Sequence, residues 1–224
     1  MNKNNFRKIL LPLIIVAAAF YSCKSDLDIL REKFRSELLE RAVNENSIKE
    51  LASTIRDDGT WPGIDYIDTS NLAFEHSRHY SNMVSMARAY CKKDSPLKGD
   101  RELKTALFKA LDFWLVNDFL CENWWYNQIG TPDAMVSLLL MLDNELSTER
   151  AEKMLKIAGR AHLNASGARP SGDRIKIAGI LAKANLFKRD ETAVDEVINI
   201  IEGEIKFAPD EQQRVDGAGN PVGE

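Results

Sequence analysis

The chain has 224 residues, of which 44% are hydrophobic and 29% are charged. This composition is typical of one or two globular domains and excludes a disordered, collagenous or multi-span membrane protein. The formal net charge of −4 argues against a general nucleic-acid binder, and three cysteines are too few for a disulfide framework.

The first 22 residues have the pattern of an export signal. Lys3, Arg7 and Lys8 carry positive charge with no acid nearby, and residues 9–20 are almost wholly apolar. This apolar stretch is too short to span a membrane as a helix, so residues 1–22 are predicted to be a signal peptide. We therefore expect the protein to leave the cytoplasm.

Cys23 directly follows this stretch, as the cysteine of a bacterial lipoprotein cleavage site does. We expect lipidation of Cys23, outer-membrane attachment, and a location in the periplasm or at the surface of a Gram-negative bacterium. An ordinary signal peptide with an incidental cysteine is the alternative. In an oxidising compartment Cys91 and Cys121 also have the opportunity to pair, which the sequence leaves open.

From residue 26 onward, apolar residues recur at the spacing of one helical face, and no segment shows sustained strand alternation. Eight helices are predicted, at 26–43, 46–55, 72–91, 100–117, 131–142, 147–161, 174–186 and 191–205. Ser47 is the expected N-cap of the second helix, and Pro132 suits the start of the fifth. Short connections favour antiparallel hairpins, so the prediction is an all-α fold.

Three segments between or after these helices are predicted to be irregular. Residues 60–70 form a loop, and Cys121–Gly130 breaks the helical pattern. Residues 207–224 contain two prolines and three glycines, which is typical of a loop that leads to a further segment. We expect the chain to be the N-terminal part of a longer protein, with a disordered natural tail as the alternative.

Charge is unevenly distributed along the chain. From Arg150 to Arg189 there are ten basic residues and only two acidic residues, Glu152 and Asp173, so this segment carries a net charge of +8. The rest of the chain after residue 22 carries a net charge of −15. A basic region on an acidic protein can concentrate a polyanion. A set of solvated helix faces explains the same pattern equally well.

The run Asn123-Trp124-Trp125-Tyr126 is a second candidate site. Three consecutive aromatic residues cannot share one helical stripe. Amphipathic aromatics on a loop beside amides suit stacking on sugar rings and hydrogen bonding to their hydroxyls. A buried corner that packs a helix junction is the alternative.

Two other groups of polar residues carry less weight. Glu75, His76 and His79 lie near one helical turn, but without a further strong ligand they favour core or polar packing over a metal site. Asp65 and Asp68 are close in a loop, which does not establish the two flanking carboxylates of a glycosidase. The sequence contains no phosphate-binding or hydrolase motif. No metal and no cofactor are predicted.

Three segments resemble polysaccharide lyase family 8, which contains the hyaluronan, chondroitin and xanthan lyases. Asn123–Leu142 is similar to the Asn-Trp-Trp…Ile-Gly-x-Pro segment of the family. Asp58–Ser70 resembles its Trp-x-x-Ile-Asp-Tyr loop, and His76–Tyr90 resembles the following helix with its Met-Ala-Arg-Ala-Tyr ending. The resemblance covers about residues 27–224.

This resemblance implies part of an incomplete (α/α) toroid, which β-sandwich domains follow in the family. Such enzymes cleave uronic-acid polysaccharides by β-elimination, with a tyrosine and a histidine in proton transfer and an asparagine that neutralises the uronate carboxylate. Asn123, Trp124 and Trp125 match the aromatic patch that positions the sugar chain. The catalytic histidine and tyrosine are expected beyond residue 224, so the chain alone is predicted to be inactive.

Arg169 stands where the family has its carboxylate-neutralising asparagine, because Ser166-Gly167-Ala168 matches the preceding Thr-Gly-Ala. Arg169 is therefore the candidate catalytic residue, and its guanidinium is suited to a bidentate contact with a carboxylate. A different substrate is the alternative explanation. Asn164 lies nearby but out of register.

The favoured interpretation is the N-terminal portion, residues 23–224, of an exported lyase acting on chondroitin- or hyaluronan-type polymers. The alternative is a non-catalytic, glycan-binding surface lipoprotein of helical architecture. Both interpretations predict an acidic polysaccharide as partner and no nucleic acid. The basic segment agrees with either interpretation. In a lyase, cations stabilise the charge that builds on a uronate when its neighbouring proton is removed. In a binding protein, a basic cleft captures the acidic polymer.

Overall fold

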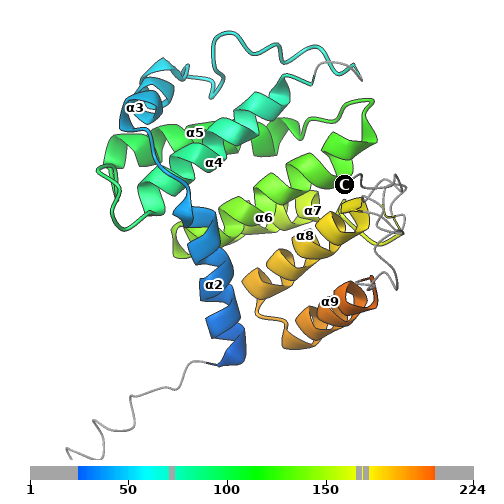
Figure 1. The fold of residues 1–224 in the computed structure, drawn as a ribbon. Coiled ribbons are helices and arrows are strands. Elements are labelled where there is room, and N and C mark those ends of the chain that lie inside the picture. Colours follow the sequence, from blue (N-terminus) through cyan, green and yellow to red (C-terminus); the bar gives the residue numbers. More distant parts are fainter. Residues whose placement is uncertain (1–24, 71–73, 165–167, 169–171, 205–224) are drawn as a thin grey trace, which may run out of the picture.

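The computed structural model describes residues 25–70, 74–164, 168 and 172–204 (Figure 1). This part of the chain contains eight α-helices and no β-strand, so the all-α prediction is confirmed. The helices are α2 (Asp26–Glu40), α3 (Glu45–Thr54), α4 (His76–Cys91), α5 (Arg101–Asn117), α6 (Thr131–Leu142), α7 (Thr148–Ala158), α8 (Gly172–Lys188) and α9 (Glu191–Glu204). A π-helical turn at Tyr126–Gly130 and a 3-10 turn at Asp143–Glu145 flank α6. The predicted signal peptide, Cys23, Arg169 and the C-terminal tail lie outside the described residues.

The helices form successive hairpins. Helices α4, α6 and α8 pack on the helix that follows each of them, namely α5, α7 and α9. The three leading helices also lie side by side in chain order, and α2 crosses them on one face (Figure 1). This open layer of antiparallel hairpins is the predicted portion of a helical toroid.

Helix α6 is the centre of the core. Every residue from Thr131 to Leu142 is buried except Asp133. A helix that is apolar on all sides must be surrounded, and α2, α4, α7 and α8 all pack against it. Among the described residues, no helix combines the length and the apolarity needed to cross a membrane.

Side-chain caps fix several helix starts. Asp100 and Ser147 accept hydrogen bonds from the backbone N–H groups of the first turns of α5 and α7. The cap of α3 is Asn44, whose Oδ1 accepts from the Ser47 N–H at 3.1 Å. The prediction of Ser47 as the N-cap is therefore wrong, because its N–H already lies within the first turn.

The predicted break at Cys121–Gly130 is confirmed only for Cys121–Asn123, which lie outside the helices. A helix begins at Trp124, passes through the π-helical turn and continues into α6 without interruption. The Thr131 N–H donates to the Tyr126 carbonyl, five residues back. The wide turn precedes Pro132, which has no N–H with which to continue the ordinary ladder. Pro132 therefore follows a helical turn rather than opening a new helix.

Candidate functional site

The aromatic run lies on a helical start and not on a loop. The Asn123 Oδ1 accepts from the Trp125 N–H at 3.0 Å, so Asn123 caps this start. The Asn127 side chain accepts from the Cys121 N–H at 3.1 Å and donates to the Cys121 carbonyl at 2.7 Å. The side-chain oxygens of Asn123, the predicted sugar-binding amide, and of Asn127 thus both hold the turn.

The two tryptophans occupy different environments. Trp124 is 36% exposed and belongs to the exposed large apolar residues of the chain. Trp125 is half-buried; its ring meets Tyr126 edge-on at 5.4 Å, and the Lys176 Nζ lies 5.8 Å from its centroid. The buried-corner alternative therefore describes Trp125 in part, while Trp124 is free to stack on a ligand.

Gly130 allows this packing. A Cβ at this position would lie 2.9 Å from the Trp125 ring and 2.9 Å from the Tyr80 hydroxyl. Both distances are shorter than real Cβ contacts, so only glycine lets the indole and the phenol close over the π-helical turn. Gly130 was not predicted as a site residue, although its place in the Ile-Gly-x-Pro motif after the aromatic run is a usable signal.

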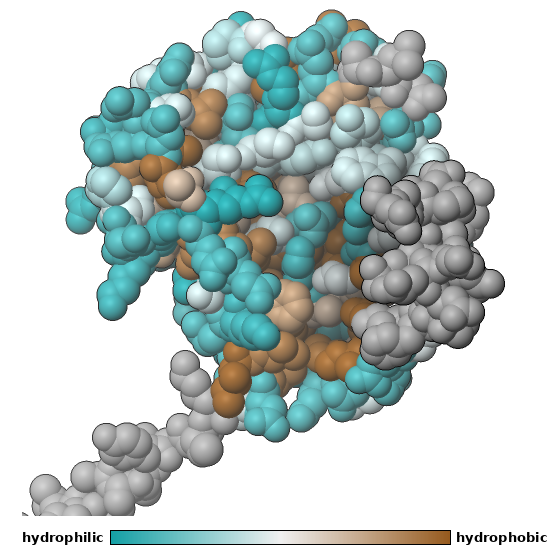
Figure 2. Space-filling view, viewed as in Figure 1, coloured by the Kyte–Doolittle hydropathy of each residue, from teal (hydrophilic) through white to brown (hydrophobic). Residues whose placement is uncertain are grey.

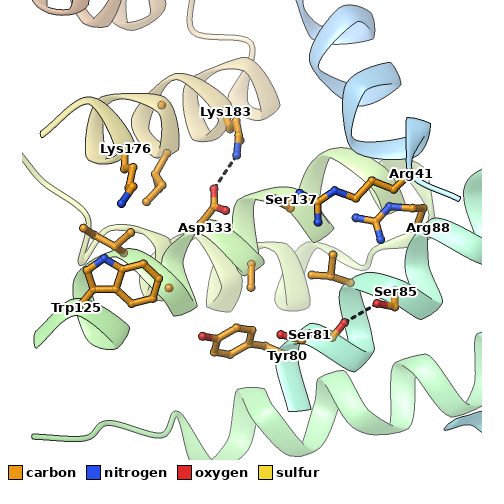
Figure 3. Close-up of a pocket in the computed structure, with 16 residues that line it drawn as sticks. Arg41, Tyr80, Ser81, Ser85, Arg88, Trp125, Asp133, Ser137, Lys176 and Lys183 are labelled. Carbon is orange, nitrogen blue, oxygen red and sulfur yellow. Dashed lines mark hydrogen bonds and ion pairs between the residues drawn. The ribbon is translucent and has the colours of Figure 1, made fainter. Parts of the chain in front are cut away.

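A pocket of about 690 Å³ opens between α4, α6 and α8, beside the end of α2 (Figure 3). We call it the central pocket. Its lining residues are Arg41, Tyr80, Ser81, Val84, Ser85, Arg88, Trp125, Ile129, Gly130, Asp133, Ala134, Ser137, Lys176, Gly179, Ile180 and Lys183. On the face seen in Figure 2, polar side chains cover most of the surface and apolar residues show between them near the middle. Trp125 and the π-helical turn that follows it thus border a cavity of ligand size.

The charges in the central pocket are mostly basic. The Lys183 Nζ pairs with Asp133 at 2.6 Å. The Arg88 Nε donates to the Leu38 carbonyl at 2.8 Å, and burial, followed by the nearby charge of Arg41, lowers the pKa of Arg88. Burial raises the pKa of the Tyr80 hydroxyl, which therefore stays protonated at neutral pH. Apart from Trp125, these residues were not predicted as a site, because four separate helices bring them together.

His76 and His79 belong to the core. The His79 Nε2 lies 3.0 Å from the Ala110 carbonyl, so it carries the hydrogen, and its Nδ1 accepts from the Tyr66 hydroxyl at 2.9 Å. The same hydroxyl accepts from the Trp61 N–H at 3.1 Å. Burial lowers the pKa of His79 to about 4 and also lowers that of His76. The His76 Nε2 lies 3.0 Å from the Tyr66 carbonyl. Both histidines are therefore neutral packing residues beside the loop at 60–70.

The other polar candidates also have structural partners. The Asp65 Oδ1 accepts from the backbone of Ile67 at 2.8 Å, and the Asp68 Oδ1 accepts from the backbone of Ser70 at 2.8 Å, so both carboxylates stabilise their own loop. Cys91 and Cys121 are free thiols and do not form the disulfide that the sequence left open. Among the described residues, no group of three or more His, Cys, Asp or Glu side chains is arranged to hold a metal ion.

The basic segment is largely paired in space. Acidic residues from other helices offset four of its cations, in the pairs Arg150–Asp112, Arg160–Asp118, Lys183–Asp133 and Arg189–Asp28. Lys153 pairs with Glu149, directly before the segment, and Lys176 pairs with Asp173 within it. The excess charge is therefore smaller in space than along the sequence, and the helix-face alternative accounts for these six cations.

The loop that carries Arg169 is described only at Ala168, which is buried and whose carbonyl accepts from the Arg174 Nη1 at 3.0 Å. Arg169 itself and Cys23 lie outside the described residues. Asn164 and His162 are both exposed. The described start of α8, which follows this loop, contributes Lys176 to the central pocket.

Comparisons with known proteins point to one family. The model of the polysaccharide lyase family 8 N-terminal α-helical domain matches residues 23–210. Chondroitinase-AC of Pedobacter heparinus is 25% identical over 138 residues, which are 61% of this chain and 19% of that protein. A hyaluronate lyase of Enterococcus faecalis is 23% identical over 146 residues, or 55% of this chain and 14% of that protein. The chain thus spans a fifth or less of the length of these relatives.

Solved structures of lyases have the same fold. A chondroitinase AC lyase studied in oligosaccharide complexes matches with a TM-score of 0.72 at 21% identity, over 81% of this chain and 27% of that one. A Paenibacillus xanthan lyase matches at 0.65 and 21% identity, over 82% of this chain and 19% of that one. The chondroitin AC lyase of Streptomyces coelicolor A3, in complex with chondroitin sulphate, matches at 0.61 and 18% identity, over 84% and 25%.

Proposed function

Because the chain belongs to polysaccharide lyase family 8 through its N-terminal α-helical domain, we propose that it is the substrate-positioning part of an exported lyase. The substrates are uronic-acid polysaccharides of the chondroitin or hyaluronan type, and the reaction is β-elimination. One observation carries the proposal. In a chain that matches this family over residues 23–210, one helical turn presents an exposed Trp124 beside a Trp125 that lines a pocket.

Within this proposal the tryptophans bind the sugar chain. Trp124 is exposed and available for stacking, and Trp125 forms the border of the central pocket. Asn123 keeps the turn closed through its Oδ1, so the described contacts support a positioning role for this residue rather than direct recognition.

Arg169 neutralises the uronate carboxylate in this proposal. Removal of the neighbouring proton builds negative charge on that carboxylate, and a fixed cation lowers the barrier. The residues that move the proton are contributed by a part of the protein beyond residue 224. In the complete protein, Arg169→Ala lowers turnover, and Arg169→Lys restores only part of it because an ammonium lacks the planar fork. An unchanged kcat/KM in Arg169→Ala on the native polymer contradicts the assignment.

The location outside the cytoplasm is also a proposal, supported by the basic and then apolar residues 1–22 and by Cys23 at their end. Mass spectrometry of the mature protein tests it. An acylated Cys23 at the N-terminus is the expected result. A mature chain that keeps residues 1–22 contradicts it.

The catalytic assay uses the absorbance of the conjugated, unsaturated uronate formed from chondroitin and hyaluronan. The complete open reading frame should form this product, and the 224-residue chain alone should bind the polymers without cleaving them. Trp124→Ala should weaken binding by roughly 1–3 kcal/mol, on the scale of aromatic stacking in other polymer-binding proteins. Binding without product from the complete protein instead supports the glycan-binding lipoprotein.

A further inference from the structure

We propose that the central pocket binds an acidic sugar residue through Arg41 and Arg88, at the end away from Trp125. The proposal rests on the proposed function and adds to it a site that selects the polymer. Figure 3 shows the arrangement, with Trp125 at one end and the two guanidinium groups next to one another at the other. One continuous cavity therefore connects Trp125, where a sugar chain stacks in the proposed function, with Arg41 and Arg88.

The cations at the two ends of the pocket differ in their partners. Lys183 pairs with Asp133 at 2.6 Å, and Lys176 pairs with Asp173 at 3.1 Å. Among the described residues, no carboxylate pairs with Arg41 or Arg88. The uncompensated positive charge of the pocket is therefore concentrated at the arginine end.

The geometry of the two arginines suits an oxyanion. The Arg88 guanidinium is half-buried and held by its Nε on the Leu38 carbonyl, so its orientation is fixed. Arg41 is close enough for its charge to lower the pKa of Arg88. Two guanidinium groups that repel one another favour an anion between them, and each offers a planar set of donors to a carboxylate or a sulfate ester.

The walls of the pocket are built from small residues. Gly130, Ala134 and Ser137 line it from the π-helical turn and α6, and Gly179 lines it from α8. A Cβ at Gly179 would meet no atom within 4 Å, so the space beyond this residue is open. Glycine is unfavourable inside a helix, and nothing in the packing around Gly179 requires it. We therefore attribute the glycine at position 179 to the cavity, which a larger side chain would partly fill.

The experiment measures binding of a chondroitin sulfate hexasaccharide and a hyaluronan hexasaccharide by calorimetry, at one ionic strength. Arg41→Gln removes a cation from an exposed side chain that makes no side-chain hydrogen bond to the described residues, so the fold should be unaffected. Loss of one charge-assisted contact should raise Kd about tenfold. Arg101→Gln, an exposed arginine outside the central pocket, is the matched control and should leave Kd unchanged.

Gly179→Leu tests the cavity independently of charge. It should raise Kd as strongly as Arg41→Gln does, with the melting temperature unchanged or higher. A lower melting temperature of Gly179→Leu with an unchanged Kd means that polypeptide and not sugar packs here, and it overturns the proposal. If Arg41→Gln raises Kd for both hexasaccharides, the bound group is the carboxylate. If it raises Kd for the sulfated hexasaccharide alone, the bound group is the sulfate ester.

The outcomes also separate this proposal from the proposed function. A wild-type chain that binds, with a Kd sensitive to Trp124→Ala but not to Arg41→Gln or Gly179→Leu, overturns the pocket proposal alone. A wild-type chain that binds neither hexasaccharide overturns both.

Discussion

At the scale of single residues, the fold requires a glycine at position 130 and a neutral histidine at position 79. Gly130 lies where two aromatic side chains leave no room for a Cβ. His79 is fully buried and keeps two hydrogen bonds that depend on its neutral form. Each residue leads to a prediction about stability that can be tested without any ligand.

Gly130→Ala should destabilise the fold by about 1–3 kcal/mol, because the added methyl displaces the Trp125 ring or the Tyr80 hydroxyl. Gly179→Ala is the matched control within the same pocket. Since its new methyl meets no atom within 4 Å, it should stabilise the fold by roughly 0.5–1 kcal/mol. Chemical denaturation measures both, and a shift of the same sign in the two variants contradicts the packing described for Gly130.

Stability should depend on pH through His79. Its pKa is about 4 in the folded protein against an ordinary 6.5, so between these values the unfolded chain binds the proton and the folded chain does not. Stability is therefore complete above pH 6.5 and falls as the pH drops towards 4, by roughly 3 kcal/mol for this group. His76, whose pKa is also lowered, acts in the same direction.

Denaturation at pH 7.5 and pH 4.5 measures this loss. His79→Gln should flatten the dependence. An NMR titration of the imidazole resonances reports the same pKa directly and does not rely on a folded variant. A His79 resonance that titrates near 6.5 would show that the ring is not desolvated.

At the scale of elements, the start of the helix at Trp124 decides how the aromatic patch is presented. Asn123→Ala removes the cap and should destabilise the fold by about 1 kcal/mol. Asn123→Asp keeps the acceptor and adds a negative charge that a helix N-terminus favours, so its stability should match that of the wild type. If Asn123→Ala were as stable as the wild type in denaturation, the amide would be free for direct contact with the sugar.

At the scale of the whole molecule, two arginine–aspartate pairs, Arg31–Asp143 and Arg189–Asp28, hold α2 across the hairpins. The Arg31 Nη2 lies 2.6 Å from the Asp143 Oδ1, and the Arg31 side chain is only 7% exposed. Arg189 pairs with Asp28 at the start of α2, where the arginine is largely exposed. Because a buried ion pair leaves an uncompensated charge when it is broken, the first pair should matter more than the second.

Asp143→Asn should therefore lower the free energy of unfolding by about 1–3 kcal/mol. Asparagine has nearly the same shape as aspartate, so the substitution makes no new steric demand on the backbone at this position, where φ is 39° and ψ is −107°. Asp28→Asn, which weakens the exposed pair, should change stability little. Equal losses in urea denaturation would mean that the burial of Arg31 contributes nothing to the docking of α2.

The sequence by itself determined the helical class, the number and approximate limits of the helices, and the family. Apolar residues at helical spacing report which face each helix buries, and the short Trp-Pro-Gly-Ile-Asp-Tyr and Asn-Trp-Trp blocks are specific enough to identify relatives. It placed the tryptophans together correctly but on a loop, because Pro132 was taken as a helix start. A π-helical turn that carries a helix past a proline leaves no periodic signal.

Only the tertiary structure decided which charges are paired and where a cavity forms. The segment 150–189 carries +8 along the chain, yet Asp28, Asp112, Asp118 and Asp133 come from elsewhere to meet it. The central pocket joins side chains that are up to 142 positions apart, from Arg41 to Lys183. Pairing and cavity formation depend on distances in space, which local periodicity does not encode, because the same helices packed in another order would place different side chains together.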